Sequence, residues 1–545
     1  MSRKFIKPLA LSLALTLSVA VFAGCGGGNQ SGASSGSTAG ISSSAQSSSS
    51  QEAAPVVNKD AKIRIGVPDN SGVKGFEQGA NENDNQFLNA IREKTGYKNI
   101  EWNVVPQANQ LDKYNLMFAS GDVYDIIYNF DLDLFRRYSG QGAIEPVDTI
   151  LSKYGSEIVN LVTENAWSMV TLDGKKLAIP VPTYQQYNKI DVGMGFLARQ
   201  DWMDKLGLKA PTNTDELYTF LKAIKDGNPS GNGTIPYVGA AGGNGNPFDG
   251  LDVITSAFGI QGITNLAVPF IVKDGKLVDA QDYYLKDLLI YLNKMYKDGL
   301  IDNEYLFNKA QQVTEKMSAG KAASYYAGYW ELKSLEEALA KTDANAKLTY
   351  LPTIAGPDGT KGFVMPAPVS AYFMIPKGAK NPNEAVDLIN SYLKDKELQS
   401  FINFGKEGVH FDTVDGNFTP KQPEYDNIKY KIYYRLWTTA DVWLPNALLA
   451  GYEPAMKSFT GNGGQLTRFN INAYRPQTEV ELSKSKTLID LRNEYAAKII
   501  SGAMPITAVD EYFQKADAAG RQDVIQASQE WFTKDGKAIS EKLMK

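Results

Sequence analysis

In the first part of this chain, apolar and polar positions follow two periodicities, one typical of strands and one typical of helices. Together they predict an α/β unit. Three stretches have the pattern of strands: Lys62–Val67, Ile100–Val105 and Val123–Tyr128. The stretches between them have helical spacing, and Gly96 and Gly121 stop the two helices. Strand, helix, strand, helix, strand is the order of a parallel sheet with crossover helices.

A hairpin and a capped helix mark the middle of the chain. The Asp-Gly turn at Asp173 and Gly174 joins two short apolar runs. The strand Met194–Ala198 follows, and Thr212 is expected to cap a later helix while Asp215 reaches back to the cap. Further patterns predict a hairpin over Val272–Val278, helices over Asp249–Gly259, Asp282–Asp298, Asn383–Leu393, Glu397–Phe404 and Thr487–Lys545, and strands over Lys347–Pro352 and Phe363–Ile375.

The N-terminus has the pattern of an export signal. Three basic residues precede an apolar run, Leu9–Phe22, which is too short and wrongly flanked to be kept as a membrane-spanning helix. FAGC, ending at Cys25, resembles the bacterial lipobox, in which the cysteine receives a diacylglyceryl group and further acylation such as palmitate. The alternative is ordinary cleavage that leaves a free thiol. We therefore expect a signal peptide over residues 1–24 and a lipid on Cys25.

Residues 25–59 predict a disordered tether. They are mainly Gly, Ser, Gln and Ala, with almost no large apolar side chain to repay the entropy of ordering. About 30 residues of flexible coil have a reach of about 30 Å, enough to hold a folded body away from a membrane. Cys25 is the only cysteine, so a disulfide framework and a thiolate metal site are excluded.

Length and charge narrow the classes of protein that this chain can be. With 545 residues and 43% hydrophobic content, it can bury more than one core. Without its first 24 residues, which hold three of the 56 basic residues and no acid, it keeps 53 basic and 61 acidic residues, a net charge of 8 negative. A nucleic-acid partner is therefore not expected.

Few residues are available for catalysis or metal binding. His410 is the only histidine, and we expect it to have a hydrogen-bonded structural role. A glycosidase needs only two carboxylates, so that chemistry stays open among 61 acids. Asp226, Asn228 and Ser230 begin an EF-hand-like loop, but Tyr237 stands where the twelfth-position acid would be. They are weak metal candidates, against a plain Gly-rich turn, and no cofactor is expected.

Several segments resemble one protein family. They are GKKLAIP from Gly174, ARQDWMDKLGLKAPTNTDELYTFLKAIK from Ala198, FASGDVYDIIYN from Phe118, GKAASYYAGYW from Gly320 and GKEGVHFD from Gly405. They resemble the family 1 extracellular solute-binding proteins, in particular the long lipoprotein branch that serves carbohydrate ABC importers. The resemblance implies an α/β, two-lobed periplasmic-binding-protein-like fold of type II. Each lobe would be a mainly parallel sheet flanked by helices, with a hinge between them.

The same resemblance suggests boundaries for the two lobes. The first lobe is expected over 60–192 and 346–373, and the second over 193–345 and 374–545. In this family, the loops after the strands face a cleft between the lobes. Ligands do collect beyond the carboxyl ends of parallel strands.

A ligand site for a sugar needs flat aromatic surfaces and fork-like polar groups. The segment YYRLWTTADVWLP, Tyr433–Pro445, supplies both, although Trp437 and Trp443 have the alternative of being core residues. The expected ligand-binding residues are Tyr128, Asn129, Asp131, Tyr184, Trp330, Arg435, Trp437, Asp441 and Trp443.

These patterns favour a non-enzymatic, lipid-anchored, extracellular binding protein. It is expected to act as a monomer that captures a carbohydrate, an oligosaccharide by the length of the branch, and delivers it to the transmembrane subunits of an ABC permease. Two alternatives from other classes stay open: a surface-anchored polysaccharide hydrolase or lyase, and a peptide-binding or sensing lipoprotein.

Overall fold

The computed structural model describes residues 56–69, 75–106, 109–183, 193–242, 245–260, 266–359, 362–364, 367–415, 417–439, 441–442 and 467–543. The predicted signal peptide, Cys25 and nearly all of the predicted tether lie outside these residues. Tyr184 and Trp443 also lie outside them.

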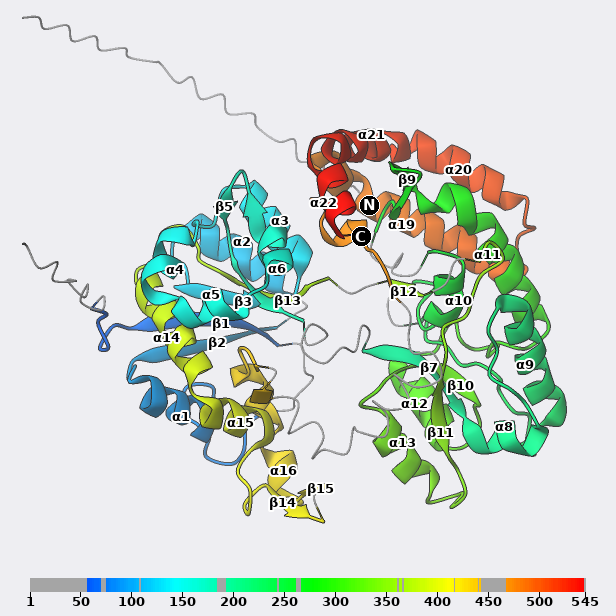
Figure 1. The fold of residues 1–545 in the computed structure, drawn as a ribbon, viewed down its shortest axis with the longest axis horizontal. Helices are drawn as coiled ribbons and strands as arrows, with labels where there is room; N and C mark the ends of the chain where they lie inside the picture. Colours follow the sequence, from blue (N-terminus) through cyan, green and yellow to red (C-terminus); the bar gives the residue numbers. More distant parts are fainter. Residues whose placement is uncertain are drawn as a thin grey trace, which may run out of the picture. The chain divides into compact units, whose positions relative to one another are not determined.

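The first lobe is built on a five-stranded sheet (Figure 1). Its order is β2-β1-β3-β13-β6, with β1 (Ile63–Asp69), β2 (Ile100–Pro106), β3 (Ile126–Asn129), β6 (Ile179–Pro182) and β13 (Val369–Met374). The strand β1 is parallel to β2 and β3, whereas β13 is antiparallel to β3 and β6. Consequently the carboxyl ends of β1, β2, β3 and β6 and the start of β13 lie at one edge, here called the first-lobe carboxyl edge.

Helices cover both sides of this sheet and enclose one apolar core (Figure 1). They are α1 (Gln86–Thr95), α2 (Gln110–Ser120), α3 (Leu132–Gly140), α4 (Asp148–Tyr154), α5 (Ser156–Leu161), α6 (Glu164–Val170), α14 (Pro382–Lys394) and α15 (Lys396–Phe404). The predicted hairpin after α6 is confirmed as β4 (Thr171–Leu172) and β5 (Lys175–Lys176). Its turn residues Asp173 and Gly174 have φ of 48° and 73°, the left-handed region that an Asp-Gly hairpin turn requires.

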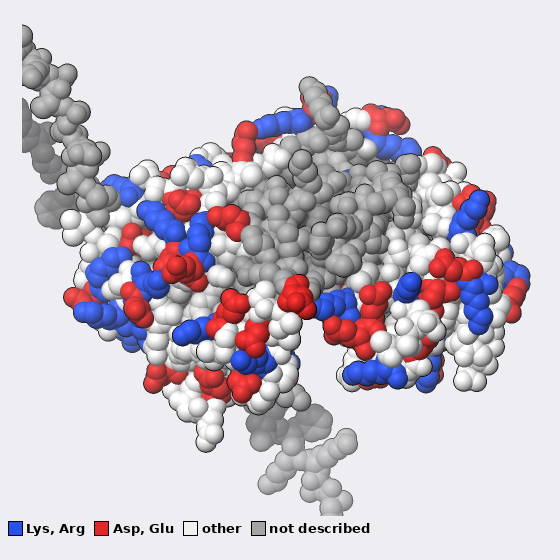
Figure 2. Space-filling model, turned by 60° about the horizontal axis from the view of Figure 1, so that its bottom comes forward, with Lys and Arg blue, Asp and Glu red and all other residues white. Residues whose placement is uncertain are grey.

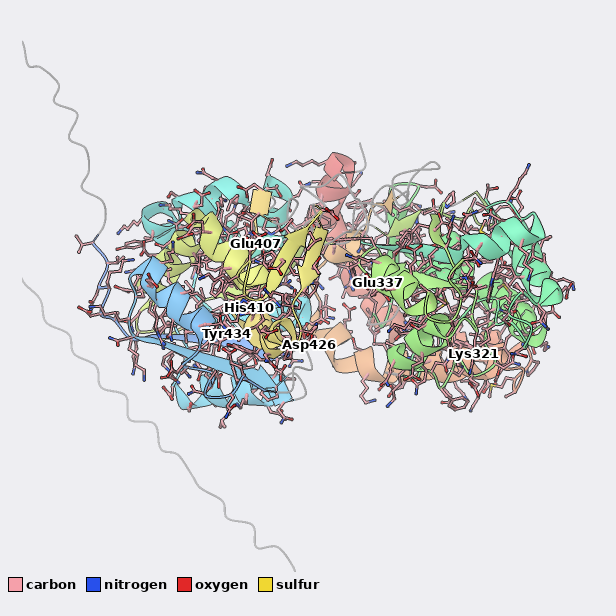
Figure 3. The ribbon with its side chains drawn as sticks, turned by 90° about the horizontal axis from the view of Figure 1, so that it is seen from below. Lys321, Glu337, Glu407, His410, Asp426 and Tyr434 are labelled. Carbon is pink, nitrogen blue, oxygen red and sulfur yellow. The ribbon has the colours of Figure 1, made fainter. Side chains whose placement is uncertain are left out.

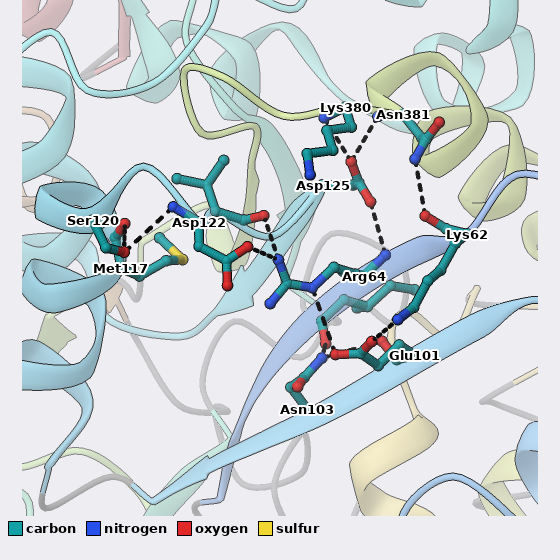
Figure 4. Close-up of polar contacts among 12 residues, drawn as sticks. Lys62, Arg64, Glu101, Asn103, Met117, Ser120, Asp122, Asp125, Lys380 and Asn381 are labelled. Carbon is teal, nitrogen blue, oxygen red and sulfur yellow. Dashed lines mark hydrogen bonds and ion pairs between the residues drawn. The ribbon is translucent and has the colours of Figure 1, made fainter.

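At the opposite edge, charged groups connect the amino ends of β1 and β2 to the segment before α14 (Figure 4). The Asp125 carboxylate accepts hydrogen bonds from the backbone N–H groups of Arg64 at 2.8 Å, Lys380 at 2.9 Å and Asn381 at 2.6 Å. The Arg64 guanidinium ion-pairs with Asp122 at 2.6 Å. The charges here largely neutralise one another within the fold.

The second lobe has a different sheet. Its named strands, β10 (Ser324–Gly328), β7 (Met194–Arg199) and β11 (Leu348–Leu351), are all antiparallel in the order β10-β7-β11. Among the described residues next to this sheet, parallel pairing occurs as isolated bridges: Asn213 with Ala355, Ile235 with Ala322 and Tyr237 with Ile301. The prediction of a mainly parallel sheet is therefore wrong for this lobe.

Helices of the second lobe surround this sheet and extend to the C-terminus. They are α8 (Gln200–Leu206), α9 (Thr214–Gly227), α10 (Asp252–Ala257), α11 (Ala280–Lys297), α12 (Ala310–Ser318), α13 (Leu332–Leu339), α19 (Glu479–Ile500), α20 (Ala508–Ala518), α21 (Arg521–Trp531) and α22 (Lys537–Leu543). The predicted hairpin is confirmed as β8 (Phe270–Lys273) and β9 (Lys276–Asp279). The helix α9 buries Leu217, Phe220, Leu221 and Ile224 as its spacing predicts.

The cap of α9 differs from the prediction by one residue. Asn213, not Thr212, is the N-cap, and its side chain accepts a hydrogen bond from the N–H of Glu216. The Glu216 carboxylate in turn accepts from the backbone and hydroxyl of Thr212, both at 2.8 Å. Asn is as good a cap as Thr, so the motif allowed either register.

The packing of α14 and α15 shows that the expected boundary between the lobes is wrong. Their apolar faces pack in the first-lobe core, which extends through the 3₁₀-helix η3 (Lys429–Tyr434) to Trp437. The strand β11, which was expected in the first lobe, instead pairs with β7, Leu348 opposite Arg199. Residues 374–437 therefore belong to the first lobe and 348–351 to the second.

The chain passes between the two sheets three times. It leaves β6 for β7, leaves β11 for β13 by way of β12 (Phe363–Val364), and leaves η3 for β16 (Thr467–Arg468) before α19. The strands β12 and β16 pair with each other in parallel, so two of the three crossings are joined by hydrogen bonds. Several connecting segments of this kind are what a hinge between two rigid lobes requires.

Candidate functional site

Three tyrosines of η3 cover the end of β1 at the first-lobe carboxyl edge. The Tyr433 hydroxyl donates to the Asp69 carboxylate at 3.0 Å, and the Tyr430 hydroxyl donates to Glu77 at 2.7 Å. The Tyr434 hydroxyl donates to the Glu82 carbonyl at 2.7 Å, and burial raises the pKa of this tyrosine, so it stays a neutral donor. These bonds fix η3 over the end of β1, and the three tyrosine rings themselves are buried there.

The turn after β3 uses most of its polar side chains internally. Asn129 is 1% exposed, and its Oδ1 accepts from the Asp131 N–H at 2.6 Å. Asp131 is the N-cap of α3, where its Oδ1 accepts from the N–H groups of Asp133 and Leu134. Asn129 and Asp131 therefore build the turn. Asn129 is buried there, whereas Asp131 is exposed, and its contact with a ligand stays a prediction.

An aromatic pair occupies the same turn. The Tyr128 ring is 8% exposed and packs against Phe130 and Phe373, with centroids 5.0 and 4.9 Å away. Phe130, which the sequence did not single out, is 42% exposed. Alternation could not have found it, because all four residues of β3 are buried and Phe130 is the first exposed residue after the strand.

The segment after η3 leads away from the carboxyl edge. Thr438 Oγ1 donates to Asn403 Oδ1, Thr439 N–H donates to Gln399 Oε1, and Asp441 ion-pairs with Lys396, so the segment follows α15 back to its first residue. The Asp441 side chain is 65% exposed. This path takes Asp441 away from the predicted site. Among the predicted residues of this segment, half-buried Arg435 lies closest to the edge, because it directly follows η3.

Trp437 is a core residue. It is 2% exposed and packs in the first-lobe core, so its ring has no free face for a sugar. The prediction of a stacking role for Trp437 is therefore wrong, and the core alternative is correct. Tyr184 and Trp443, as noted, lie outside the described residues.

Trp330 has the features of a stacking surface on the second lobe. It follows the end of β10 and is 45% exposed. A Cβ on Gly328 would lie 2.3 Å from its ring and a Cβ on Gly193 would lie 3.4 Å from it, so two glycines form the floor on which the indole rests. The Tyr329 ring meets it edge-on at 5.1 Å. The ring is thus fixed in place while part of it stays open to solvent.

The EF-hand-like loop is closed by its own hydrogen bonds. The Asp226 carboxylate ion-pairs with Lys222 at 2.7 Å, and Asn228 Oδ1 accepts three hydrogen bonds from the loop that follows. Ser230 Oγ hydrogen-bonds to Thr234 Oγ1 at 2.8 Å. These bonds are those of a Gly-rich turn, and a cation at this loop stays a prediction. In the described part of the chain, no cluster of three or more His, Cys, Asp or Glu could hold a metal ion.

His410 has the structural role that the sequence predicts (Figure 3). It is 6% exposed, and its Nδ1 accepts the Lys406 N–H at 2.8 Å. Burial lowers the pKa of His410, which favours the neutral acceptor. A Cβ on Gly405, whose φ is 84°, would come within 3.0 Å of the imidazole, so glycine is needed there.

Lys431 should make stability depend on pH. Burial, reinforced by Arg435 and Lys429, lowers its pKa to about 8, below the unfolded value of about 10.4. Between these values the unfolded chain binds more protons, so the protein gains stability as the pH rises. Replacing Lys431 with Met should therefore stabilise the protein at about pH 7, with an advantage that fades towards about pH 9.

Urea unfolding at the two pH values would measure that difference. Lys486→Met is the control, because Lys486 is 87% exposed on α19 and should have little effect at either pH. An advantage of Lys431→Met that does not change with pH would contradict the lowered pKa.

Charge on the molecular surface is mixed. Figure 2 shows basic and acidic side chains interspersed over the described surface of the face in view. The described residues of this face form no extended basic stripe of the kind that binds a phosphate backbone. Among the described helices, none is both long and apolar enough to cross a membrane.

Residues 73–399 match the family model of the bacterial extracellular solute-binding proteins. The chain belongs to this family. The match covers β2, β3, β6 and β13 of the first-lobe sheet, the second-lobe sheet and the glycine floor of Trp330, and it begins just after β1. Family membership confirms the resemblance inferred from the sequence and the prediction of a binding protein in place of an enzyme.

Named relatives in the family come from bacteria. The chain is 26% identical to lipoprotein LipO of Bacillus subtilis over 63% of this chain and 67% of LipO. It is 24% identical to the polygalacturonan/rhamnogalacturonan-binding protein YtcQ of the same organism, over 81% of this chain and 88% of YtcQ.

A solved structure has the same fold. It is the Streptococcus pneumoniae ABC-transporter substrate-binding protein FusA, an EF-hand mutant in complex with fructo-nystose, with a TM-score of 0.62 and 20% identity. The alignment covers 87% of this chain and 99% of FusA. The predicted α/β periplasmic-binding-protein fold is thereby confirmed, apart from the strand direction in the second lobe.

Proposed function

We propose that this protein is the lipid-anchored substrate-binding component of a carbohydrate ABC importer. It captures an oligosaccharide between its two lobes and delivers it, chemically unchanged, to the transmembrane subunits of the permease. The observation that carries this proposal is the partly exposed Trp330 on its floor of two glycines, because a fixed aromatic face is what the C–H face of a sugar ring stacks on.

The first lobe supplies complementary groups. The exposed ring of Phe130, the Asp69 carboxylate with its Tyr433 partner and half-buried Arg435 support this proposal, because they are groups of the kinds that stack on a sugar face and hydrogen-bond to its hydroxyls. A ligand that contacts both lobes binds the closed form better than the open form, and this difference drives closure. Moving the population from mostly open to mostly closed takes about 5.5 kcal/mol of differential binding. The names of YtcQ and FusA support a carbohydrate as the ligand.

Isothermal titration calorimetry of the mature soluble domain tests this proposal. The panel consists of fructo-oligosaccharides, oligogalacturonides, rhamnogalacturonan fragments and a mixed peptide pool. We expect saturable binding of one carbohydrate class, with the ligand recovered intact by mass spectrometry. Binding of peptides alone, or the appearance of shortened or unsaturated sugars, would instead support one of the alternative functions.

The anchor has its own test. Replacing Cys25 with Ala should prevent attachment of the lipid, because alanine has no thiol to acylate, so the exported chain should no longer incorporate radiolabelled palmitate. Palmitate labelling of the Cys25→Ala protein equal to that of the parent would contradict a lipid on Cys25 while leaving ligand binding open.

A further inference from the structure

A second exposed aromatic ring lies in the second lobe and has no part in its core. Phe307 is 80% exposed, in the loop between Tyr305 and α12. Single exposed apolar residues are common and need no explanation. For Phe307, however, the position relative to Trp330 suggests an explanation of its exposure.

The bridges of the second-lobe sheet fix that position. Tyr237 pairs in parallel with Ile301, and the Ala241 N–H donates to the Tyr305 carbonyl at 2.9 Å, so these two segments run side by side. The segment that holds Ile235 pairs in parallel with the one that leads into β10, and the Val238 N–H donates to the Ser324 carbonyl. All three segments therefore end at the same edge of the second lobe.

The register of these pairings places the segments that carry Phe307 and Trp330 at a similar height along the strand direction. Tyr237 lies opposite both Ile301 and the start of β10, so the chain beyond Tyr305 and the chain beyond Gly328 emerge together. Two strand spacings separate them, roughly 10 Å. Phe307 and Trp330 thus follow two segments that end at the same edge, with the Ile235–Ala241 segment between those segments.

The loop that presents Phe307 is rigidly held. A Cβ on Gly242 would lie 2.3 Å from the Phe307 carbonyl oxygen, so the two backbones touch, and the Gly242 N–H donates to the Asn308 carbonyl at 2.8 Å. The Asn308 side chain is buried and donates to the Gly239 carbonyl and to the Asp302 carboxylate at 2.7 Å. Lys316 of α12 joins the same network through Asp302 and Asn308. The exposed ring therefore stands on a fixed turn, as the indole of Trp330 stands on its glycines.

We propose that Phe307 and Trp330 form a two-ring platform on the second lobe, which selects saccharides long enough to reach both rings. The inference rests on the proposed function and deepens it: the ligand is an oligosaccharide whose successive rings stack on two separate aromatics. A saccharide that reaches only Trp330 stacks on one of the two aromatic rings and so makes half of these contacts. Chain length, more than the identity of a single sugar, is what Phe307 senses.

The test is a ladder of chain lengths within the carbohydrate class that the parent protein binds, from one ring upwards, titrated into the parent and three variants. Phe307→Ala should weaken binding of the longest saccharide roughly tenfold and leave the shortest that binds nearly unchanged. Phe307→Tyr keeps a ring and should behave as the parent. Phe307→Leu keeps apolar volume without a flat face and should behave as Phe307→Ala.

The control is Ile290→Ala, which removes an exposed apolar side chain, 47% accessible, from the outer part of α11 in the same lobe. It should leave every affinity unchanged. Equal affinity of Phe307→Ala and the parent at every length would overturn the platform while the proposed function stands. An equal loss at every length would also overturn it, because length selection requires a difference. Failure of the parent to bind any ladder would overturn both proposals.

Discussion

Arg475→Met should lower the free energy of unfolding by about 3–5 kcal/mol, the range found when one partner of a buried ion pair is removed. Arg475 and Glu481 are 1% and 0% exposed. Two parallel hydrogen bonds join them, at 2.6 and 2.7 Å, and Ser528 of α21 accepts another from Arg475 at 3.1 Å. Without the guanidinium, the Glu481 carboxylate stays buried and loses its directly hydrogen-bonded cation.

The double variant Arg475→Met with Glu481→Leu distinguishes the cost of an unpaired buried charge from the cost of lost side-chain packing. It removes both charges and should recover much of the loss, because two apolar side chains of similar size carry no desolvation cost. Lys486→Met, at an exposed pair on the same helix, is the matched control and should change stability by less than about 1 kcal/mol. Urea unfolding followed by circular dichroism measures all three. A single variant as stable as the parent would show that water reaches Glu481.

Much of the first lobe could be predicted because its elements are local patterns. The strands β1, β2 and β3 and the helix α1 each carry an apolar spacing that only one type of element satisfies, and Gly96 ends α1 in the left-handed conformation that glycine adopts easily. Their order then leaves few possible sheets. The family resemblance supplied what no local pattern contains, namely a second lobe and a hinge.

Membership of a lobe could not be predicted in the same way. The spacing of α14 shows which of its faces is buried, and Leu388 and Ile389 are indeed inaccessible. It does not show which of two cores receives that face, because both cores are apolar. The strand β11 raised the same problem, since an edge strand pairs wherever a free strand such as β7 is available.

The site residues illustrate a related ambiguity. Trp437 and Trp330 are the same residue type, each in an aromatic-rich segment, yet one is 2% and the other 45% exposed. Short polar residues after a strand, such as Asn129, suit a ligand and a turn equally well, and here the turn uses them. Phe307 had the opposite difficulty: an apolar residue in a loop suggests a small core contact, and only the bridges of the sheet reveal its position.

Trp330→Ala should abolish most ligand binding and leave the fold intact. A fixed, partly exposed tryptophan at the centre of a site behaves as a hot spot, and its loss costs about 2 kcal/mol or more, roughly 30-fold in Kd. The indole rests on glycines at the end of β10 and little core packs around it, so the free energy of unfolding should change by only about 1 kcal/mol. Calorimetry with the saccharide that the parent binds, together with a melting curve, measures both effects.

Trp437→Ala is the counterpart that gives this result its meaning. Its ring fills the first-lobe core, so its removal should cost about 3–5 kcal/mol of stability, while the folded fraction keeps its affinity. Trp330→Phe retains a smaller ring on the same glycine floor and should bind with intermediate affinity. Trp330→Ala should therefore lose ligand binding and keep its stability, whereas Trp437→Ala should lose stability and keep its ligand affinity. A Trp330→Ala protein that binds as the parent does would remove the observation on which the carbohydrate site depends, whereas one that melts early would show the indole to be part of the core.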